Sequence, residues 1–319
     1  MKKSTKAVLL SSFICIGAGI LLSGIGFACG GQPGIILTRK GVFSSSSRPE
    51  YTLHKTKIDS VSNVQIEINS MADIQILPSE DDHFYLEYKL DGNSDRPSYE
   101  VTDGTLHLTQ DGSSTQIIGL DFGILGRNDN TGYYCSLYIP EGTFLQTLNI
   151  SGDSGDLSLE SLSVDSAEIF LGFGDLDMKD SSFKDLTLKL DSGDLSGKAV
   201  TADTLHLTNS FGNSNLQAFT GKDVTVNMDS GDFSMEAAAL RSFSGVNSFG
   251  NMTLSIPAPL DIYAFDLGTE FGSVSLPENA PESFRSEDDV FEDYYKTEGT
   301  GDKKIEITAE SGDIKIREY

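Results

Sequence analysis

The sequence of 319 residues has no tryptophan, only three cysteines, and 23 basic against 48 acidic side chains. Three cysteines are too few for a disulfide framework, and Cys135 has no neighbouring cysteine or histidine in sequence that would make it a reactive thiolate. The formal net charge of -25 repels nucleic acids and anionic lipids, so we exclude nucleic acid as a partner. We find no nucleophile motif, phosphate loop or paired-cysteine motif, and we predict that the chain is not an enzyme.

Glycine is abundant, with 32 residues, and this favours turn-rich β structure. Through the middle of the chain a glycine recurs at a fixed period, and such self-similarity indicates stacked repeat units. Each glycine lies in a four-residue corner, and serine and phenylalanine alternate in the position before it. The glycines are Gly155, Gly174, Gly193, Gly212, Gly231 and Gly250.

Apolar residues keep fixed distances from these glycines. Positions +2 and +4, as in Leu157 and Leu159, predict one strand, and positions +12, +14 and +16, as in Ala167, Ile169 and Leu171, predict a second. We therefore predict an all-β fold, a parallel β-solenoid of about 19-residue coils, in which small serines leave room for the phenylalanines stacked between them. A coil of twice that length, with serine and phenylalanine corners on opposite edges, and an antiparallel sandwich stay open as alternatives.

The N-terminus carries the pattern of a membrane anchor. Lysines precede an uncharged segment at residues 7–28, which as a helix would be about 33 Å long, enough to span a bilayer. We predict a cytoplasmic segment 1–6, one transmembrane signal anchor at 7–28, and an extracytoplasmic remainder on a bacterial cell membrane. A cleaved signal and a lipoprotein are the alternatives; Cys29 is a weak lipidation candidate, because Phe27 fits a lipobox poorly.

The exported part divides by composition. Residues 29–50 are predicted to be a linker, and residues 51–319 a β-repeat domain. Within the domain we expect regular repeats at 150–276, an acidic surface insertion at 278–304 and C-terminal strands at 303–319 that cap the stack. The segment before the repeats is expected to form an N-terminal cap or irregular opening coils, interrupted by a glycine-rich excursion at 111–131. A corner-like Ser70-Met71-Ala72-Asp73 has alanine in the place of the glycine.

An acid or amide follows each repeat glycine, and in coils of one repeat each these side chains would stand about 4.8 Å apart. We favour a turn role, in which the side-chain oxygens accept backbone N–H groups. Calcium binding is the alternative, because oxygen ligands at this spacing could share the ion; the β-roll signature Gly-Gly-x-Gly-x-Asp is absent. No other cofactor is predicted. The weak calcium candidates are Asp156, Asp175, Asp194 and Asp232.

Together, the anchor, the Leu137–Pro140 strand and the repeated Ser-Gly-Asp-Leu corners resemble the bacterial "putative adhesin" family of β-strand-repeat domains of unknown function. The resemblance covers residues 51–319. It implies a β-solenoid displayed outside the membrane that makes contacts, and it supplies no catalytic residues.

We therefore predict a membrane-anchored, surface-exposed, non-catalytic module for adhesin-like binding or scaffolding, with envelope sensing as one role. Its partners would be the membrane, through residues 7–28, and an envelope or extracellular protein or glycan. A polysaccharide-acting enzyme on a β-helix scaffold and a regulatory partner of a membrane protein are the alternatives. The four histidines, His54, His83, His107 and His206, are scattered in the sequence. His107 and His206 both occur as Thr-Leu-His-Leu-Thr and are expected on outward strand positions rather than as ligands.

Overall fold

The computed structural model describes residues 50–92, 94–111, 132–283 and 293–319, three strands at 34–38, 41–44 and 118–121, and four single helical residues, Ser12, Ile16, Gly19 and Leu22. The chain forms two compact units. One consists of Met1–Glu50 and Ser113–Thr131, and the other of Tyr51–Gly112 and Gly132–Tyr319.

Apart from the four single residues, the expected membrane segment 7–28 lies outside the described residues, as does Cys29. Across the described residues, no helix has the length and apolar character needed to cross a membrane.

The smaller unit contains a three-stranded antiparallel sheet in the order β2-β1-β9. Its strands are β1 (Gly34–Thr38), β2 (Gly41–Ser44) and β9 (Ile118–Asp121). Two of them lie in the segment expected to be a linker, and the third lies in the excursion at 111–131. The short apolar runs beside Gly34 and Gly41 are typical of strands, and the pairing with a distant segment could not be inferred from either stretch alone.

The larger unit is one sheet wound on itself. Its strands are β3 (Glu50–Ile58), β4 (Asn63–Met71), β5 (Asp73–Pro78), β6 (Phe84–Asp91), β7 (Ser98–Thr102), β8 (Thr105–Gln110), β10 (Tyr134–Ile139), β11 (Phe144–Ser154), β12 (Leu157–Glu160), β13 (Ser163–Phe173), β14 (Leu176–Lys179), β15 (Ser182–Ser192), β16 (Leu195–Lys198), β17 (Thr201–Phe211), β18 (Ser214–Ser230), β19 (Phe233–Ala238), β20 (Ser242–Phe249), β21 (Met252–Ile256), β22 (Tyr263–Phe271), β23 (Val274–Ser275), β24 (Asp293–Lys296), β25 (Lys303–Ser311) and β26 (Ile314–Glu318), with one 3₁₀ turn, η1 (Leu260–Ile262).

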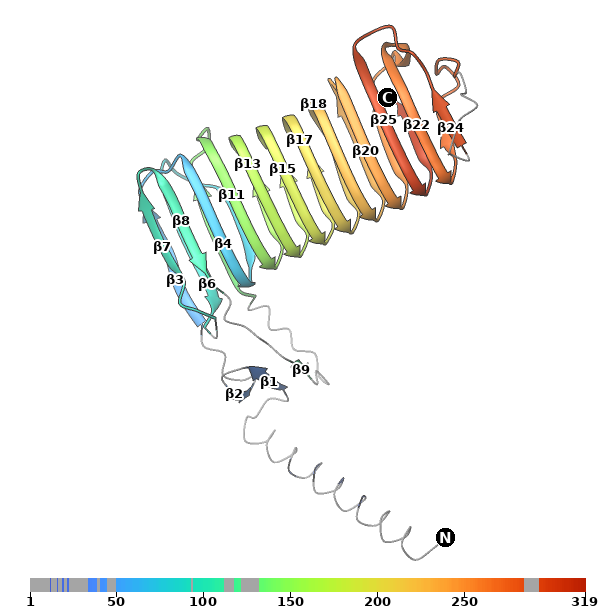
Figure 1. Cartoon of the computed structure of the whole chain (residues 1–319). Coiled ribbons are helices and arrows are strands. Elements are labelled where there is room, and N and C mark those ends of the chain that lie inside the picture. The colour runs from blue at the N-terminus through green and yellow to red at the C-terminus, as the bar shows by residue number, and fades with distance from the viewer. Residues whose placement is uncertain are drawn as a thin grey trace, which may run out of the picture. The chain divides into compact units, whose positions relative to one another are not determined.

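Each regular coil contains one long strand and one short strand. The long strands β11, β13, β15 and β17 pair in parallel, and partners such as Ile169 and Leu188 are one repeat apart. The short strands β12, β14 and β16 pair in the same way, as Leu157 does with Leu176. Figure 1 shows the long strands side by side from β7 to β24. The all-β, solenoid-like prediction is confirmed, and in this array the coil has the shorter of the two predicted lengths, one repeat per coil.

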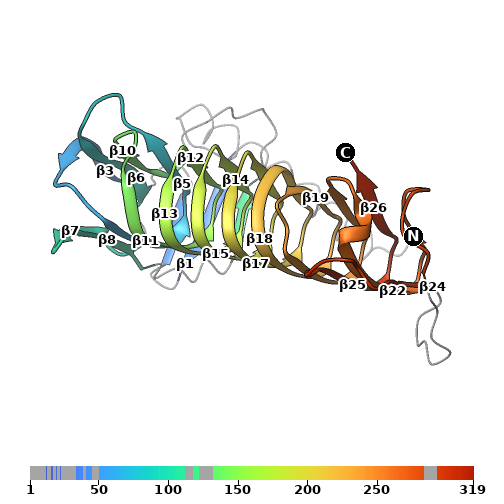
Figure 2. The same ribbon diagram turned by 90° about the horizontal axis from the view of Figure 1, so that it is seen from above.

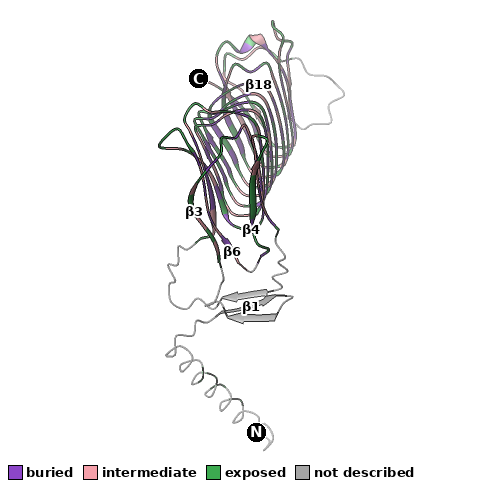
Figure 3. Ribbon diagram, turned by 90° about the vertical axis from the view of Figure 1, so that its left-hand side faces the viewer, coloured by how far each residue is buried: buried purple, intermediate pink, exposed green. Residues whose placement is uncertain are grey.

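The core lies between the two strand layers. The side chains predicted to face inward do so: Leu157, Ala167, Ile169 and Leu171 are each at most 2% exposed. Figure 3, coloured by burial, shows the buried positions alternating with exposed ones along the strands. At roughly 25 cal/mol per Å² of buried apolar surface, this continuous core is the main source of stability, because no coil could bury its faces alone.

The glycine corners leave no space for a side chain. Gly193 has φ 149°, and a Cβ on it would lie 1.9 Å from the carbonyl oxygen of Gly174 in the preceding coil. The other repeat glycines make the same approach to the corner before them. The corner before Gly155 has Ala72 in the position of the glycine. A Cβ on Gly155 would lie 2.1 Å from the carbonyl oxygen of Ala72. The period of glycine therefore follows from backbone contact between coils.

The N-terminal end is closed by an irregular cap, as expected. Strands β4 and β5 form the first coil against β11 and β12, and β8 lies on the other side of β4. Antiparallel β7 then covers the edge of β8. On the short-strand layer, β10 continues from β5 and antiparallel β6 follows it. Figure 2, seen from above, shows the coils following one another behind this cap.

The C-terminal end differs from the prediction. The strands at 303–319 do not cap the stack: β25 and β26 pair with β20 and β21 on one side and with β22 and β23 on the other. The outermost coil, with β22 and β23, therefore comes earlier in the chain, and the last strands, β25 and β26, insert between it and the coil of β20 and β21. The end is covered instead by antiparallel β24, from the expected acidic insertion. Lys296 Nζ of β24 forms an ion pair with Asp266 Oδ2 at 2.8 Å, and Tyr295 packs against the core.

We predict that Gly193→Ala lowers the free energy of unfolding by about 3 kcal/mol or more, because its Cβ would collide with a backbone carbonyl and its φ is unfavourable for alanine. Urea and thermal denaturation of the full chain, followed by circular dichroism, measure the change.

The matched control is Gly142→Ala. Gly142 also has a positive φ, 77°, but a Cβ there would meet nothing within 4 Å. It should cost only about 1 kcal/mol. Equal losses in the free energy of unfolding for the two variants would contradict the close contact between stacked corners.

Candidate functional site

The acids and amides after the repeat glycines form a hydrogen-bonded column. Asp156 Oδ1 accepts the backbone N–H of Asp175 at 2.9 Å, and Asp175 Oδ1 accepts that of Asp194 at 2.8 Å. Asp194 Oδ1 accepts the N–H of Asn213 at 2.7 Å. The column begins at Asp73 and continues through Asp232, Asn251, Asp313 and Ser273. Each acid or amide side chain of the column, from Asp73 to Asp313, therefore accepts a backbone N–H of the next coil.

This geometry refines the turn role predicted for the column, because the N–H that is bonded belongs to the neighbouring coil and not to the same turn. Within the described ranges, no three histidine, cysteine, aspartate or glutamate side chains gather into a group that could hold a metal ion. Calcium binding at Asp156, Asp175, Asp194 and Asp232 remains a prediction.

Exposed apolar side chains form a second row on the same corners, one residue before every second repeat glycine. Phe173, Phe211 and Phe249 are 62%, 61% and 61% exposed. Strand pairing places Ser154 and Ser192 on either side of Phe173, and Ser230 between Phe211 and Phe249. We call this row the phenylalanine ladder. The alternation of large and small residues was predicted, but the rings are a surface feature and not part of the packing between coils.

The ladder keeps its alternation where the chain order is reversed. In sequence Phe271 follows Phe249, and Ser311 comes last. In space Ser311 pairs with Phe249 on one side and with Phe271 on the other. Met71, 63% exposed, extends the pattern beyond Ser154 at the other end. The alternation therefore belongs to the folded surface and is not a simple product of a sequence unit two repeats long.

Buried polar side chains support three of the phenylalanine corners from within. Asn209 and Asn247 are 0% exposed, and their Nδ2 atoms donate to the carbonyls of Gly193 and Gly231 at 3.1 and 2.9 Å. Thr269 Oγ1 donates to Gly312 O at 2.9 Å. Each bond ties a phenylalanine corner to the serine corner beside it. Sequence analysis missed these residues, although Asn-Ser-Phe-Gly-Asn recurs at 209–213 and 247–251.

These asparagines carry an energetic cost. Among the described residues, the buried Oδ1 atoms of Asn209 and Asn247 have no hydrogen-bond partner. An unsatisfied buried acceptor destabilises a protein by about 1–3 kcal/mol. The equivalent residues beneath Phe173 and Ser192 are Leu171 and Leu190, each 1% exposed, so an apolar side chain fits this position. The unsatisfied Oδ1 atoms of the two asparagines therefore lower stability. The effect seen in the structure is the hydrogen bond from each Nδ2, which holds a phenylalanine corner to the serine corner beside it.

Acidic groups flank the ladder. The column of acids and amides follows it in each corner, and on the serine coils an exposed acid also precedes it. These preceding acids are Asp153, Asp191, Asp229 and Glu310. On the three central phenylalanine coils the preceding residue is small: Gly172, Ser210 and Ser248. The ladder is thus an apolar row with oxygen acceptors on both sides.

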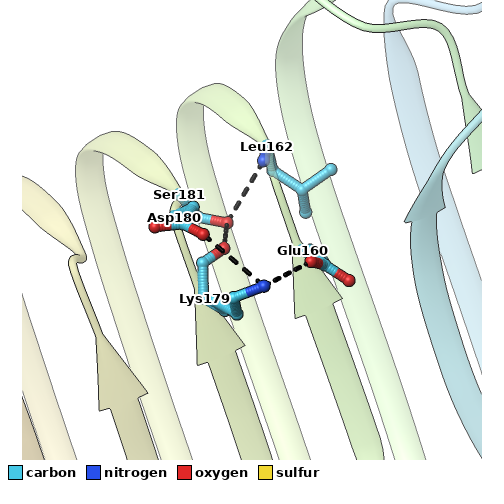
Figure 4. Close-up of polar contacts among 5 residues, drawn as sticks. All are labelled: Glu160, Leu162, Lys179, Asp180 and Ser181. Carbon is cyan, nitrogen blue, oxygen red and sulfur yellow. Dashed lines mark hydrogen bonds and ion pairs between the residues drawn. The ribbon is translucent and has the colours of Figure 1, made fainter.

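The second turn of the coil borders a groove of ≈ 280 Å³ beside β12, β14 and β16. Figure 4 shows Lys179 Nζ contacting Glu160 Oε1 of the neighbouring coil at 2.7 Å, and Ser181 Oγ accepting the N–H of Leu162 at 3.1 Å. The hydrogen bond to Glu160 raises the pKa of Lys179. A lysine that stays protonated is neither a base nor a nucleophile. The groove lining has no aromatic side chain, and neither of its two acids, Glu160 and Asp177, is buried.

The remaining candidates have structural positions. Cys135 in β10 is 0% exposed, and burial raises the pKa of its thiol to about 12. Such a thiol is unreactive at neutral pH. His107 lies on an outward strand position of β8 and His206 on an exposed one of β17, as predicted, and His54 and His83 are exposed.

These features define an extended β-solenoid with patterned corner rows. A family model described as Toastrack DUF4097 matches residues 63–317. The chain therefore belongs to the Toastrack DUF4097 family, a domain of unknown function, and the adhesin-like family resemblance is confirmed.

Solved structures give distant similarities. A structure called a "putative adhesin" from Bacteroides fragilis NCTC 9343 has 15% identity and a TM-score of 0.44, covering 86% of this chain and 98% of its own. One called a "putative cell adhesion protein" from Clostridium sporogenes ATCC 15579 has 13% identity and a TM-score of 0.27, covering 86% and 100%. A "putative lipid binding protein" from Parabacteroides distasonis ATCC 8503 has 18% identity and a TM-score of 0.36, covering 85% and 96%. No curated protein matches the chain.

The column predicts a difference between two substitutions. Asp194→Ala removes the acceptor of the Asn213 N–H and should lower the free energy of unfolding by about 1 kcal/mol. Asp194→Asn keeps an acceptor, as Asn213 does in the next coil, and removes a like charge beside Asp175, so stability should be unchanged or slightly higher. Denaturation curves measure both, and equal losses would contradict the backbone role.

The same proteins test calcium. With a purely structural column, millimolar calcium should leave the melting temperature of the parent chain unchanged. A rise that follows mass action, and that Asp194→Asn reduces, would assign the column to calcium instead.

Proposed function

We propose that this chain is a membrane-anchored, extracytoplasmic β-solenoid that acts as a non-catalytic, adhesin-like binding module. The observation that carries the proposal is the phenylalanine ladder, an alternating row of exposed apolar side chains held along the described coils. A concentration of exposed apolar side chains bordered by polar groups is typical of interaction sites. The row keeps its alternation at the C-terminal end, where the order of the coils in space differs from their order in the chain.

Anchoring is proposed from the sequence. Residues 7–28 are uncharged and long enough for a membrane helix, and Lys2, Lys3 and Lys6 before them favour an internal N-terminus. The solenoid, with its strong negative charge, would then stand outside the membrane. A non-catalytic role is supported by equivalent carboxylates that repeat from coil to coil, whereas acid–base catalysis needs two groups in unlike surroundings.

The binding role can be tested in intact cells of the producing bacterium. A photoreactive benzoylphenylalanine placed at Phe211 should form covalent adducts with an envelope component on irradiation. The same residue placed at Ser196, an exposed position on the short strand β16, is the matched control and should form few. The difference is expected because only Phe211 lies on the proposed binding row.

A third sample separates anchoring from binding. A chain that lacks residues 1–28 should stay inside the cell and give no envelope adducts. Equal adduct yields from positions 211 and 196, or adducts that persist in the truncated chain, would contradict the proposal.

A further inference from the structure

The spacing of the phenylalanine ladder limits what can lie along it. Neighbouring coils stand about 4.8 Å apart, so successive rings recur at about 9.6 Å. An extended peptide repeats every two residues, at about 6.8 Å, so it loses register at the first step between rings. Two turns of an α-helix advance about 10.8 Å, so a helix runs about 1.2 Å further out of register at each successive ring. A linear ligand that uses the whole row must instead repeat at close to two coil spacings.

Two kinds of extended polymer have such a repeat. A polyproline II helix advances about 9.3 Å per turn of three residues. In a β-1,4-linked glycan, one sugar ring advances slightly more than one coil spacing, and successive rings turn over, so equivalent faces recur at every second ring. Spacing alone favours neither, and the chemistry beside the ladder decides between them.

The flanking groups are hydrogen-bond acceptors. Asp175 and Asp194 use Oδ1 for the backbone of the next coil, which leaves Oδ2 of each exposed carboxylate for a ligand. On the serine coils, Asp191 and Asp229 add exposed carboxylates on the other side. Acceptors in both rows need a ligand that is rich in donors. A proline-rich chain has few N–H groups to offer, whereas every sugar ring carries hydroxyl donors.

Charge excludes further occupants. The chain has a net charge of -25, and acids border the ladder on both sides, so an anionic polymer or a second copy of this chain would be repelled. An uncharged glycan avoids this repulsion. Its C–H groups carry slight positive charge, which complements the negative face of an aromatic ring.

We propose that the phenylalanine ladder binds an uncharged β-1,4-linked glycan chain that lies along the solenoid axis. Every second sugar ring packs its C–H face against Phe173, Phe211 or Phe249, and hydroxyl groups donate to the flanking carboxylates. The bonds from the buried Asn209 and Asn247 fix two of these corners before the ligand arrives, which lowers the cost of ordering on binding. This inference rests on the proposed binding function and names its ligand class.

The test is calorimetric titration of the full chain in lipid nanodiscs with cellohexaose and with chitohexaose. Binding of either supports the class, and the tighter one identifies glucose or N-acetylglucosamine as the repeating sugar. Maltohexaose, whose α-1,4 links give a curved chain, should bind about tenfold more weakly or not at all. A β-1,4-linked disaccharide, which reaches one ring instead of three, should also bind about tenfold more weakly.

Variants localise the site. The triple variant Phe173→Ser, Phe211→Ser and Phe249→Ser gives these coils the residue that their neighbours already have, so the fold should be kept, and affinity should fall by about tenfold or more. Phe170→Ser is the matched control. Phe170, 38% exposed, lies on β13 outside the ladder, and its loss should leave affinity unchanged.

Several results would overturn the inference: no binding of either β-linked hexamer, equal binding of maltohexaose, unchanged affinity in the triple variant, or tighter binding of a polyproline peptide. None of these results would remove the proposed function if position 211 still forms envelope adducts in cells. If those adducts are absent while the hexamers bind as expected, the ladder binds glycan but the proposed display on the envelope fails.

Discussion

The contact between stacked corners determines the rest of this molecule. At each corner a glycine without a Cβ lets the carbonyl of the preceding coil come so close that a methyl group on Gly193 would lie 1.9 Å from Gly174 O. The residue after it then bonds the backbone of the next coil, as Asp194 does to Asn213 at 2.7 Å. Each bond contributes only about 1 kcal/mol. Repeated along the stack, the two features hold every coil at the same length and in the same register.

A fixed register turns sequence positions into rows on the surface. Residues at +2 and +4 from the glycine become one wall of the core, and the residue before the glycine becomes an exposed row. That row alternates large and small side chains at every described corner from Met71 to Phe271. At the C-terminal end the alternation requires that Ser311 lies between the coils of Phe249 and Phe271, which both come earlier in the chain. A chain that simply wound in order would place Phe249 and Phe271 on adjacent coils.

Much of this architecture could be predicted from the residues. The glycine period, with the alternating apolar positions around it, predicted coils of one repeat each and an inward face at residues such as Leu157 and Ile169, because local periodicity determines which side chains share a face. The column of acids was also predicted, although the partner of each one lies in the next coil. The family resemblance followed from the same corners.

Other features depend on distant segments and could not be predicted. The long gap in sequence between Gly272 and Gly312 does not show on which side of β22 the strand β25 will pair. The exposure of Phe211 depends on where the chain turns, and strict alternation would have placed its ring inward. Asn209 occupies the +16 position, where the sequence predicts an inward strand residue, and only the neighbouring coil reveals the carbonyl that it bonds. The pairing of β1 with β9 joins two segments that lie far apart in the sequence.

The order of the corners can be measured most directly by disulfide cross-linking in a background with Cys15→Ser and Cys29→Ser, since the buried Cys135 should not react. Corner positions one coil apart lie about 4.8 Å apart, within the range that a disulfide bridges, and positions two coils apart lie about 9.6 Å apart, beyond it. We expect Phe249→Cys to cross-link with Ser311→Cys, and Ser311→Cys with Phe271→Cys, but not Phe249→Cys with Phe271→Cys. Efficient cross-linking of positions 249 and 271 would show that the coils follow chain order, and it would contradict the alternating ladder.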